Sequence, residues 1–428
     1  MPIKTVIVVR HGETDFSAEG RYQGGLDTPF LSSRGIEQSQ ELCTCISTWK
    51  VGSVYCSSLK RARGTLDILR SSLPERCNIN MTENMKEITI SEWESKLKCD
   101  IQDQMPNSMM LWRYFPHLFR DASGNMPLIS LYQRVCGFLA ECKYLGDDPT
   151  LFVGHDHVNR SIISNLIGLP ISIHHGIPQG LSSISILTKE RQSYGFQINA
   201  SNLAHKSGFC VPIENTPVPR IILIRHGITQ ANKDLLYQGS TDTPLTDEGR
   251  EQICRAKTLL TEIGRPSLIV CSSLLRAFES ACLLFDGYSI NVDHRLDEFH
   301  YGHWQGMSVS DVEREFPNEV KAWHSLMSDN PISDGERISN LAGRVMSISA
   351  ELIKAALPDR TVVVVAHDII IRAIIALNMR LDIRHLWKFP ISNSGITEMR
   401  LNPFQNWVLF RHNIMYGRLE ERYGKRYF

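Results

Sequence analysis

The residues of this chain that could do chemistry are concentrated in a tripeptide that occurs twice. Arg10-His11-Gly12 follows the apolar run Thr5–Val9, and Arg225-His226-Gly227 follows Arg220–Ile224. Arginine presents a planar fork of donors that matches phosphate or carboxylate oxygens, and a neutral imidazole can attack as a nucleophile. One Arg-His-Gly is weak evidence, whereas two copies, each behind a β-type run, indicate a duplicated unit.

The sequence after each tripeptide also matches, at a nearly constant offset. Four further groups keep this register: Tyr22-Gln23-Gly24 with Tyr237-Gln238-Gly239, Cys56–Ala62 with Cys271–Ala277, Glu87 and Trp93 with Glu298 and Trp304, and His155-Asp156 with His367-Asp368. Matches of this number predict two homologous domains. We predict their bounds as residues 1–206 and 219–428, joined by a Pro- and Gly-containing linker over residues 207–218.

Length and composition limit the class of protein. A chain of 428 residues exceeds the usual size of one core and suits two domains. The formal net charge is zero, which argues against nucleic acid or an anionic membrane as the main partner. No apolar run approaches the roughly 20 residues of a membrane-spanning helix, and no signal peptide is evident. Eleven scattered cysteines without a Cys-x-x-Cys pair suit reduced thiols, so we expect a cytoplasmic protein.

Alternating strand and helix patterns predict an α/β fold in each half. In the second half, Ile221–Ile224, Leu268–Cys271 and Val362–Ala366 read as buried parallel strands. Between the first two, Thr246–Ile263 begins with a helix start signal and continues with helical periodicity. The first half repeats the strands at Val6–Val9, Val54–Cys56 and Leu151–Val153. Each half is therefore predicted to be a three-layer α/β/α domain, with helices on both faces of a mainly parallel sheet.

Other segments complete each predicted domain. Ser95–Pro127 and Gly306–Pro331 read as helical insertions that form a lid. A more exposed β segment is expected to close each half, at Ser182–Leu187 and at Gly395–Met399. The polar and aromatic tail Met415–Phe428 receives no assignment.

The duplicated polar residues lie where parallel strands end. In an open α/β sheet, ligands collect beyond the carboxyl ends of the strands. In the first half, His11, Arg61 and His155 follow three such strands, and the second half has His226, Arg276 and His367. Two arginines and two histidines would then converge on one point in each domain, which indicates a tetrahedral oxyanion as ligand. Glu87 and Glu298 are available as proton donors to a leaving group.

Each of these residues alone has an ordinary structural interpretation, such as a satisfied polar group or a surface charge. The functional interpretation is favoured because both halves keep the whole set. His157, His174 and His175 lack counterparts in the second half and receive no function. His300 and His303 could suggest a metal, but the acid-rich spacing of a metal site is absent, so no metal is expected.

Taken in order, these motifs resemble those of the histidine phosphatase superfamily, also called phosphoglycerate mutase-like. The motifs are Arg-His-Gly-x-Thr, Ser-x-Leu-x-Arg-Ala, Glu-x-x-x-Gly-x-Trp-x-Gly at Glu298–Gly306, and the late strand-end histidine followed by Arg372. The resemblance covers nearly the whole chain. It implies hydrolysis of small phosphorylated metabolites through a phosphohistidine, with neither metal nor cofactor.

The resemblance also implies a role for each duplicated residue. His11 and His226 would be the nucleophiles, and Glu87 and Glu298 the acids. The remaining eight would bind phosphate: Arg10, Thr14, Arg61 and His155 in the first half, and Arg225, Thr229, Arg276 and His367 in the second. Thr14 and Thr229 would contribute hydroxyl donors.

The second half is closer to the family pattern than the first. It keeps Gly302, Gly306 and Asp334-Gly335-Glu336, where the first half has Ser91, Ser95 and Asn125-Met126. We therefore expect the first pocket to have a different shape and to prefer another substrate.

Three alternatives stay open at this stage. The short lids favour hydrolysis over a cofactor-dependent phosphomutase. One half could instead bind phosphate without turnover in a regulatory or scaffolding protein, and phosphoproteins could be the substrates. Substrate identity and oligomeric state do not follow from the sequence.

Overall fold

The computed structural model describes residues 4–142, 148–189, 195–206, 209–210, 217–358, 360–402 and 406–417. The chain divides into two compact units between Phe209 and Cys210, inside the predicted linker. Most of that linker, and the tail beyond Gly417, lie outside the described residues. Among the helices that are described, none has both the length and the apolar character required to cross a membrane.

The first unit is built on a six-stranded sheet with the order β3-β2-β4-β1-β5-β6. The strands β1 to β4 are mutually parallel. β5 pairs antiparallel with β1, and β6 pairs antiparallel with β5. Their bounds are β1 Lys4–Arg10, β2 Ser53–Ser57, β3 Asn78–Thr82, β4 Thr150–Gly154, β5 Ile184–Lys189 and β6 Gln197–Leu203. The three predicted parallel strands of this half are confirmed as β1, β2 and β4.

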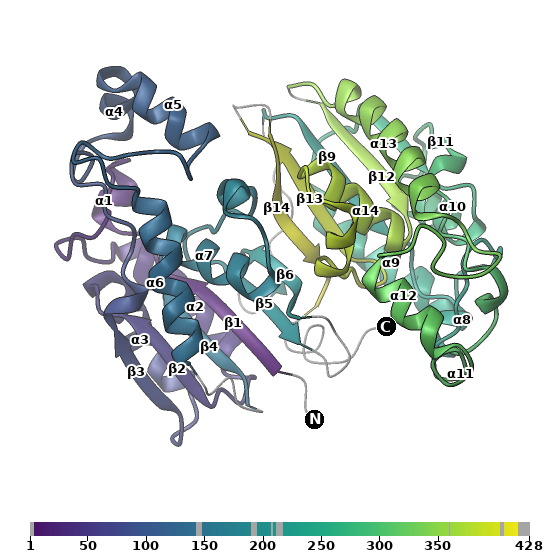
Figure 1. Ribbon diagram of the computed structural model, residues 1–428, viewed down its shortest axis with the longest axis horizontal. Helices are drawn as coiled ribbons and strands as arrows, with labels where there is room; N and C mark the ends of the chain where they lie inside the picture. Colours follow the sequence, from purple (N-terminus) through teal and green to yellow (C-terminus); the bar gives the residue numbers. More distant parts are fainter. Residues whose placement is uncertain are drawn as a thin grey trace. The chain divides into compact units, whose positions relative to one another are not determined.

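Helices of the first unit cover both faces of this sheet. Their bounds are α1 Asp15–Ala18, α2 Ser33–Ile46, α3 Lys60–Leu69, α4 Lys98–Gln104, α5 Pro106–Tyr114, α6 Pro127–Glu141 and α7 Asp156–Ile167. From β1 to β3 the chain moves toward one edge of the sheet, and after β3 it returns to β4. Because parallel crossovers are right-handed, helices that connect strands in opposite directions lie on opposite faces. The pair α2 and α3 therefore packs together on one face, and the pair α6 and α7 on the other. The lid helices α4 and α5 stand clear of the sheet (Figure 1).

The second unit repeats this architecture. Its sheet has the corresponding order β11-β10-β12-β9-β13-β14. The strands are β9 Arg220–Arg225, β10 Leu268–Cys271, β11 Asn291–Val292, β12 Thr361–Ala366, β13 Ile396–Leu401 and β14 Trp407–Ile414. The helices are α8 Gln230–Lys233, α9 Asp247–Lys257, α10 Leu275–Leu284, α11 Val309–Glu315, α12 Pro317–Ser325, α13 Ile338–Ala355 and α14 Asp368–Asn378. Both lids are helical, as predicted. The lid of the first unit contains α4 and α5, and the lid of the second unit contains α11 and α12.

Two expectations about local structure were wrong. The helix predicted over Thr246–Ile263 ends at Lys257 and continues only as a 3-10 turn, Thr258–Leu260. The closing strands β5 and β13 are buried rather than exposed. Each pairs on both edges, β5 with β1 and β6, and β13 with β9 and β14, so each lies inside its sheet.

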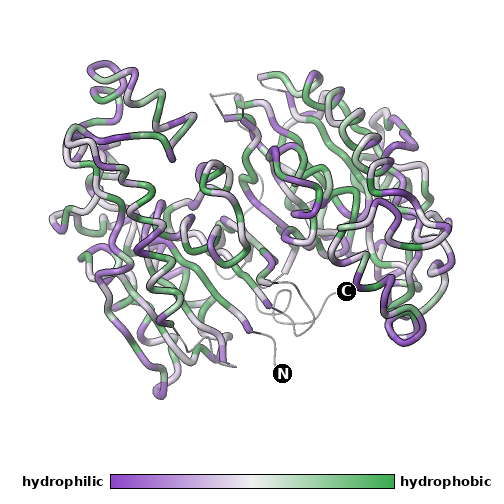
Figure 2. Tube along the Cα trace, in the orientation of Figure 1, coloured by the Kyte–Doolittle hydropathy of each residue, from purple (hydrophilic) through white to green (hydrophobic). Residues whose placement is uncertain are grey.

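The parallel strands form the core of each unit. Val6–Val9 of β1 and Val362–Ala366 of β12 are fully buried. Hydrophobic residues accordingly run without alternation along the central strands (Figure 2), as expected for strands covered on both faces. Polar groups can therefore reach solvent only at the strand ends, where the repeated residues lie.

A close backbone approach fixes the loop that follows β1. Ser32 is the N-cap of α2, and its hydroxyl accepts a hydrogen bond from the Gly35 backbone N–H. Gly35 packs so closely on this loop that a Cβ atom there would overlap the carbonyl oxygen of Glu13. Glycine is required because a backbone atom, which cannot rotate away, occupies the space.

We predict that Gly35→Ala destabilises the first unit by about 1–3 kcal/mol, because the added methyl group forces the backbone apart. The matched control is Gly137→Ala in the interior of α6, where a Cβ would meet open space and should stabilise the helix by up to about 1 kcal/mol. Urea unfolding followed by tryptophan fluorescence measures both changes. Equal unfolding midpoints for the two variants would contradict the packing argument.

Candidate active sites

A histidine stands at the end of the first strand of each unit, and one hydrogen bond sets its tautomer. The His11 backbone N–H donates to Gly154 O of β4 (3.1 Å), which fixes it at the carboxyl end of the sheet. Its Nδ1 lies 2.7 Å from Gly12 O, and His226 Nδ1 lies 2.7 Å from Gly227 O. Since a carbonyl oxygen only accepts, Nδ1 carries the proton and Nε2 keeps its lone pair.

Both histidines are held neutral. His11 and His226 are each 2% exposed. Burial lowers their pKa well below the usual value, and the guanidinium groups of Arg61 and Arg10, or of Arg276 and Arg225, lower it further. A buried, neutral imidazole with a free Nε2 lone pair can act as a nucleophile at neutral pH.

Two arginines flank each histidine, and backbone carbonyls hold them in place. Arg61 donates to Gly24 O (2.8 Å) and Leu26 O (2.7 Å), and Arg276 donates to Gly239 O (2.7 Å) and Thr241 O (2.8 Å). Burial lowers the pKa of Arg61 and of Arg276 to about 10, so both stay charged.

The other arginine of each unit ends the strand before its histidine. Arg10 donates to Gln179 O and Arg225 to Ile391 O, both at 2.6 Å. Among the described residues, no acceptor bonds the buried Nε atoms of Arg10, Arg225 and Arg276. Fixed cations with spare buried donors are suited to a phosphate oxygen.

The second histidine of each unit touches the first. The ring centroids of His11 and His155 lie 5.1 Å apart, as do those of His226 and His367. His155 Nε2 lies 2.8 Å from Ser57 Oγ, and its Nδ1 accepts from Arg61 Nε (3.1 Å). These two histidines are fully buried behind the nucleophile, and neither is among the residues that line the cavities. Their predicted contact with phosphate therefore stays a prediction.

A buried glutamate faces each site, held by backbone N–H groups. Glu87 Oε2 accepts from His157 N (3.1 Å) and its Oε1 from Ile88 N (2.8 Å). Glu298 Oε1 accepts from Phe299 N (2.9 Å). Burial raises the pKa of both carboxyl groups, and the neighbouring Asp156 or Asp368 raises it further. The raised pKa extends the protonated, proton-donating form to higher pH.

The sequence motifs contained a further pair of acidic residues that we had not assigned. Asp156 and Asp368 line the two cavities. Asp156 accepts from Arg160 Nε at 2.6 Å and lies 3.8 Å from Arg10 NH1. Burial would raise the pKa of Asp156, but Arg160 and Arg10 outweigh it and hold the pKa below its usual value. The signal was present, because Asp and the arginine four residues later occur in both halves.

Thr14 and Thr229 begin short helices beside the two sites. Each is the buried N-cap of a short helix, α1 or α8, in a reciprocal capping box with Ser17 or Asn232. Neither threonine lines a cavity, whereas Ser17 and Asn232 do. The threonines therefore position these two polar side chains, and their donation to phosphate stays a prediction.

The two cavities share their floor and differ in their walls. They have volumes of about 110 Å³ in the first unit and about 130 Å³ in the second. Both are lined by the strand-end arginine and histidine, the helical arginine, the glutamate, the aspartate and the Tyr-Gln-Gly segment. The walls differ at aligned positions: Arg21, Lys98 and His157 line the first cavity, where the second unit has Leu236, Val309 and Ile369. The expected difference in pocket character is therefore present.

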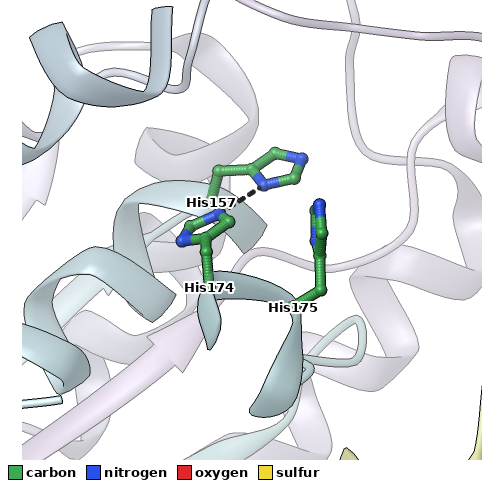
Figure 3. A group of neighbouring side chains, drawn as sticks. All are labelled: His157, His174 and His175. Carbon is green, nitrogen blue, oxygen red and sulfur yellow. Dashed lines mark hydrogen bonds between the residues drawn. The ribbon is translucent and has the colours of Figure 1, made fainter. Parts of the chain in front are cut away.

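Three histidines of the first unit form a cluster beside its cavity (Figure 3). The possible ligand nitrogens of His157, His174 and His175 lie within 4.8 Å of one another, close enough for imidazole ligands of a metal ion. However, Arg160 NH1 lies 3.2 Å from His175 Nδ1, and His175 Nε2 donates to Trp112 O (3.0 Å). Because a guanidinium group opposes a dication there, a neutral hydrogen-bonded cluster fits these residues better than a metal centre.

Comparison with known proteins gives a consistent answer for both units. The family model described as "Histidine phosphatase superfamily (branch 1)" matches residues 6–203 and 221–414. Glucosyl-3-phosphoglycerate phosphatase of Mycolicibacterium vanbaalenii is 37% identical over 174 residues, which are 39% of this chain and 76% of that protein. 2-carboxy-D-arabinitol-1-phosphatase of Triticum aestivum is 20% identical over 431 residues, 92% of this chain and 82% of that protein. A solved mycobacterial glucosyl-3-phosphoglycerate phosphatase is 31% identical, with a TM-score of 0.42, and covers 46% of this chain and 99% of its own.

We predict that Arg276→Met raises the pKa of His226, because it removes the larger of the two cationic contributions that lower it. The pKa should still lie below the usual value, since burial is the larger cause. NMR titration of the histidine ring nitrogens measures it directly. The surface variant Arg314→Met is the matched control and should leave the titration unchanged. An equal pKa in Arg276→Met and in the original chain would mean that the guanidinium does not act on the histidine.

Proposed function

Since this chain belongs to the histidine phosphatase superfamily, we propose that it hydrolyses phosphomonoesters of small metabolites at two sites, one in each of the domains 1–206 and 219–428. Each site uses its own nucleophile, His11 or His226. One observation supports this most directly: in both units Nδ1–H is bonded to a backbone carbonyl, Nε2 has no hydrogen-bond partner among the described residues, and two guanidinium groups act on the ring.

The first step transfers the phosphoryl group to the enzyme. Nε2 of the neutral histidine attacks phosphorus, so an N–P bond forms while the P–O bond to the alcohol breaks. Arg10 and Arg61, or Arg225 and Arg276, stabilise the charge on the phosphoryl oxygens. Glu87 or Glu298, whose raised pKa extends its protonated form to higher pH, gives its proton to the leaving alkoxide.

The second step returns the enzyme to its initial state. The glutamate, now a carboxylate, takes a proton from water as the water oxygen attacks phosphorus. The N–P bond breaks and inorganic phosphate leaves, so that the histidine is neutral and the glutamate protonated again. Phosphate binding by Thr14, Thr229, His155 and His367 belongs to this proposal.

The remaining expectations form part of the same proposal. The two arginines supply the positive charge that a metal ion would otherwise provide, so neither metal nor cofactor takes part. The partner is a small phosphorylated molecule, without nucleic acid or membrane. The described cysteines form no disulfide, which is compatible with the expected cytoplasmic location.

The single variants His11→Ala and His226→Ala test whether both units are active. Each should keep the activity of the other unit, and the double variant should lose at least about 10⁴-fold. The assay follows release of inorganic phosphate in EDTA, with acid-labile, base-stable labelling of the protein as evidence of phosphohistidine. Formation of an isomerised substrate without release of phosphate would contradict hydrolysis. Loss of activity in EDTA would contradict the metal-free mechanism. Full activity in the double variant would exclude both histidines as nucleophiles.

The pH dependence should follow the glutamate. As pH rises through its raised pKa, Glu298 loses the proton that the leaving alkoxide needs, so kcat for alkyl phosphates should fall. Acidification should not protonate His226 until well below pH 6.5. In a His11→Ala background, Glu298→Gln should slow alkyl phosphate hydrolysis by about 10²–10⁴-fold and remove the alkaline decline.

A leaving group that needs no proton provides the control. p-Nitrophenyl phosphate should lose less activity in Glu298→Gln than alkyl phosphates do. An equal loss for both substrates would show that Glu298 is not the general acid.

A further inference from the structure

Aligned wall positions of the two cavities differ in charge. Lys98 is the first residue of α4, and the aligned first residue of α11 is Val309. His157 is the second residue of α7, and the aligned residue of α14 is Ile369. Arg21 corresponds to Leu236. The first cavity therefore has two more formal cations than the second, Lys98 and Arg21, while the floor of both is the same.

The two additional cations are not equivalent. Arg21 donates to Glu19 Oε2 (2.6 Å) and to Ser95 O (2.9 Å), so a neighbouring carboxylate already neutralises it. The Lys98 ammonium forms neither an ion pair nor a hydrogen bond with any described residue. Lys98 is exposed to solvent where it lines the cavity. Local desolvation and the Arg10 guanidinium lower its pKa, while the Asp156 carboxylate raises it. Lys98 thus lines the cavity as an exposed cation without a direct ion pair among the described residues, and Asp156 is the carboxylate of this cavity that acts on it.

His157 belongs to a chain of hydrogen bonds. Its Nδ1 lies 2.9 Å from His174 Nε2, and His174 Nδ1 lies 3.1 Å from the Tyr132 hydroxyl. The Ser164 side chain lies near the phenol of Tyr132 and opposes the rise in its pKa that burial causes. Figure 3 shows the second ring nitrogen of His157 directed away from His174. This Nε2 has no partner among the described residues, and His157 lines the cavity.

The positions of the protons give this chain of hydrogen bonds a direction. Burial lowers the pKa of His157 and of His174 well below the usual value, so each ring carries one proton. Among the described residues His174 Nδ1 is the hydrogen-bond partner of the Tyr132 hydroxyl, so the phenol donates its proton there, and His174 Nε2–H then donates to His157 Nδ1. His157 is left with its proton on Nε2, where it is a donor facing the cavity.

The second unit replaces every member of this chain with an apolar residue. The aligned positions of Tyr132, His157, Ser164 and His174 are Ala342, Ile369, Ala376 and Leu386. All four replacement positions are buried or partly buried. Buried polar groups are costly unless each one is bonded. Replacement of the complete set, rather than of single members, indicates that the four residues act together.

We propose that Lys98 and His157 form a subsite of the first cavity that binds a second oxyanion of the substrate, such as a carboxylate, and that the second cavity lacks this subsite. Tyr132 and His174 are positioning residues that hold the His157 proton on Nε2. The inference rests on the proposed function of both units. It assigns substrates with an additional negative charge to the first unit, and substrates with a neutral or apolar leaving group to the second.

The test compares two substrates of nearly equal shape in chains with one active unit. 3-Phosphoglycerate carries a carboxylate, and glycerol 3-phosphate carries a hydroxymethyl group in its place. In the His226→Ala chain, the ratio of kcat/KM for 3-phosphoglycerate to that for glycerol 3-phosphate should be high. Lys98→Val and His157→Ile, which introduce the residues of the second unit, should each lower it by about 10- to 100-fold, mainly through KM. Lys50→Val, at an exposed lysine outside the cavity, is the control and should leave the ratio unchanged.

The reciprocal variant keeps the test independent of folding defects in the first unit. In the His11→Ala chain, Val309→Lys should raise the same ratio. A ratio that neither Lys98→Val nor Val309→Lys alters would overturn the subsite, while hydrolysis of both substrates would leave the proposed function standing. If the first unit hydrolyses neither of these two substrates nor p-nitrophenyl phosphate, its proposed function fails instead.

Ring-nitrogen NMR tests the positioning role separately. His157 should be the Nε2–H tautomer in the intact chain, and Tyr132→Phe should shift it toward Nδ1–H while lowering the substrate ratio. An Nδ1–H tautomer in the intact chain would overturn the direction of the hydrogen-bond chain.

Discussion

The hydrogen bond from histidine Nδ1 to the carbonyl of the following glycine is the interaction on which each site depends. It fixes which nitrogen carries the proton, and so which nitrogen can attack phosphorus. The bond is possible because the histidine has just left a buried parallel strand, and its own N–H is tied to the neighbouring strand, β4 or β12. Glycine at the next position allows the close approach of α2 or α9, whose backbone a Cβ on Gly12 or Gly227 would overlap. The fold therefore determines a tautomer, and the tautomer determines the chemistry.

Opposite pKa shifts follow from the same burial. Burial disfavours charge on the imidazole and on the carboxyl group alike, so His226 stays unprotonated while Glu298 keeps its proton to higher pH. The fixed guanidinium groups add to the first effect and oppose the second. Their charge is retained because backbone carbonyls and the aspartates at the start of α7 and α14 compensate part of it. A nucleophile and an acid with suitable protonation states thus arise from one environment.

The sequence was sufficient to predict what depends on the order of residues along the chain. Apolar runs located β1, β2 and β4, and duplication located the arginine, histidine and glutamate set, because strand ends of a parallel sheet meet at one edge. It was insufficient where the role of a residue depends on a pairing, cap or ion pair that only the folded structure shows. The burial of β5 depends on pairing along both edges, and Thr14 is a cap because Ser17 bonds back to it. The aspartates were visible in both copies, but their ion pairs with Arg160 and Arg372 exist only in the fold.

The cluster of His157, His174 and His175 shows why unmatched residues also matter in a duplicated chain. Comparison of the copies favours what they share, so it identifies the chemistry and passes over what distinguishes one pocket from the other. The structure supplies the missing criterion. One buried and two half-buried imidazoles, with a half-buried phenol, are costly to keep beside a core, and the second unit has apolar or aromatic residues at the aligned positions. The fold therefore does not require this polar cluster. The cluster adjoins a cavity that also contains the unpaired Lys98. The ligand that this cavity binds best explains why both are present.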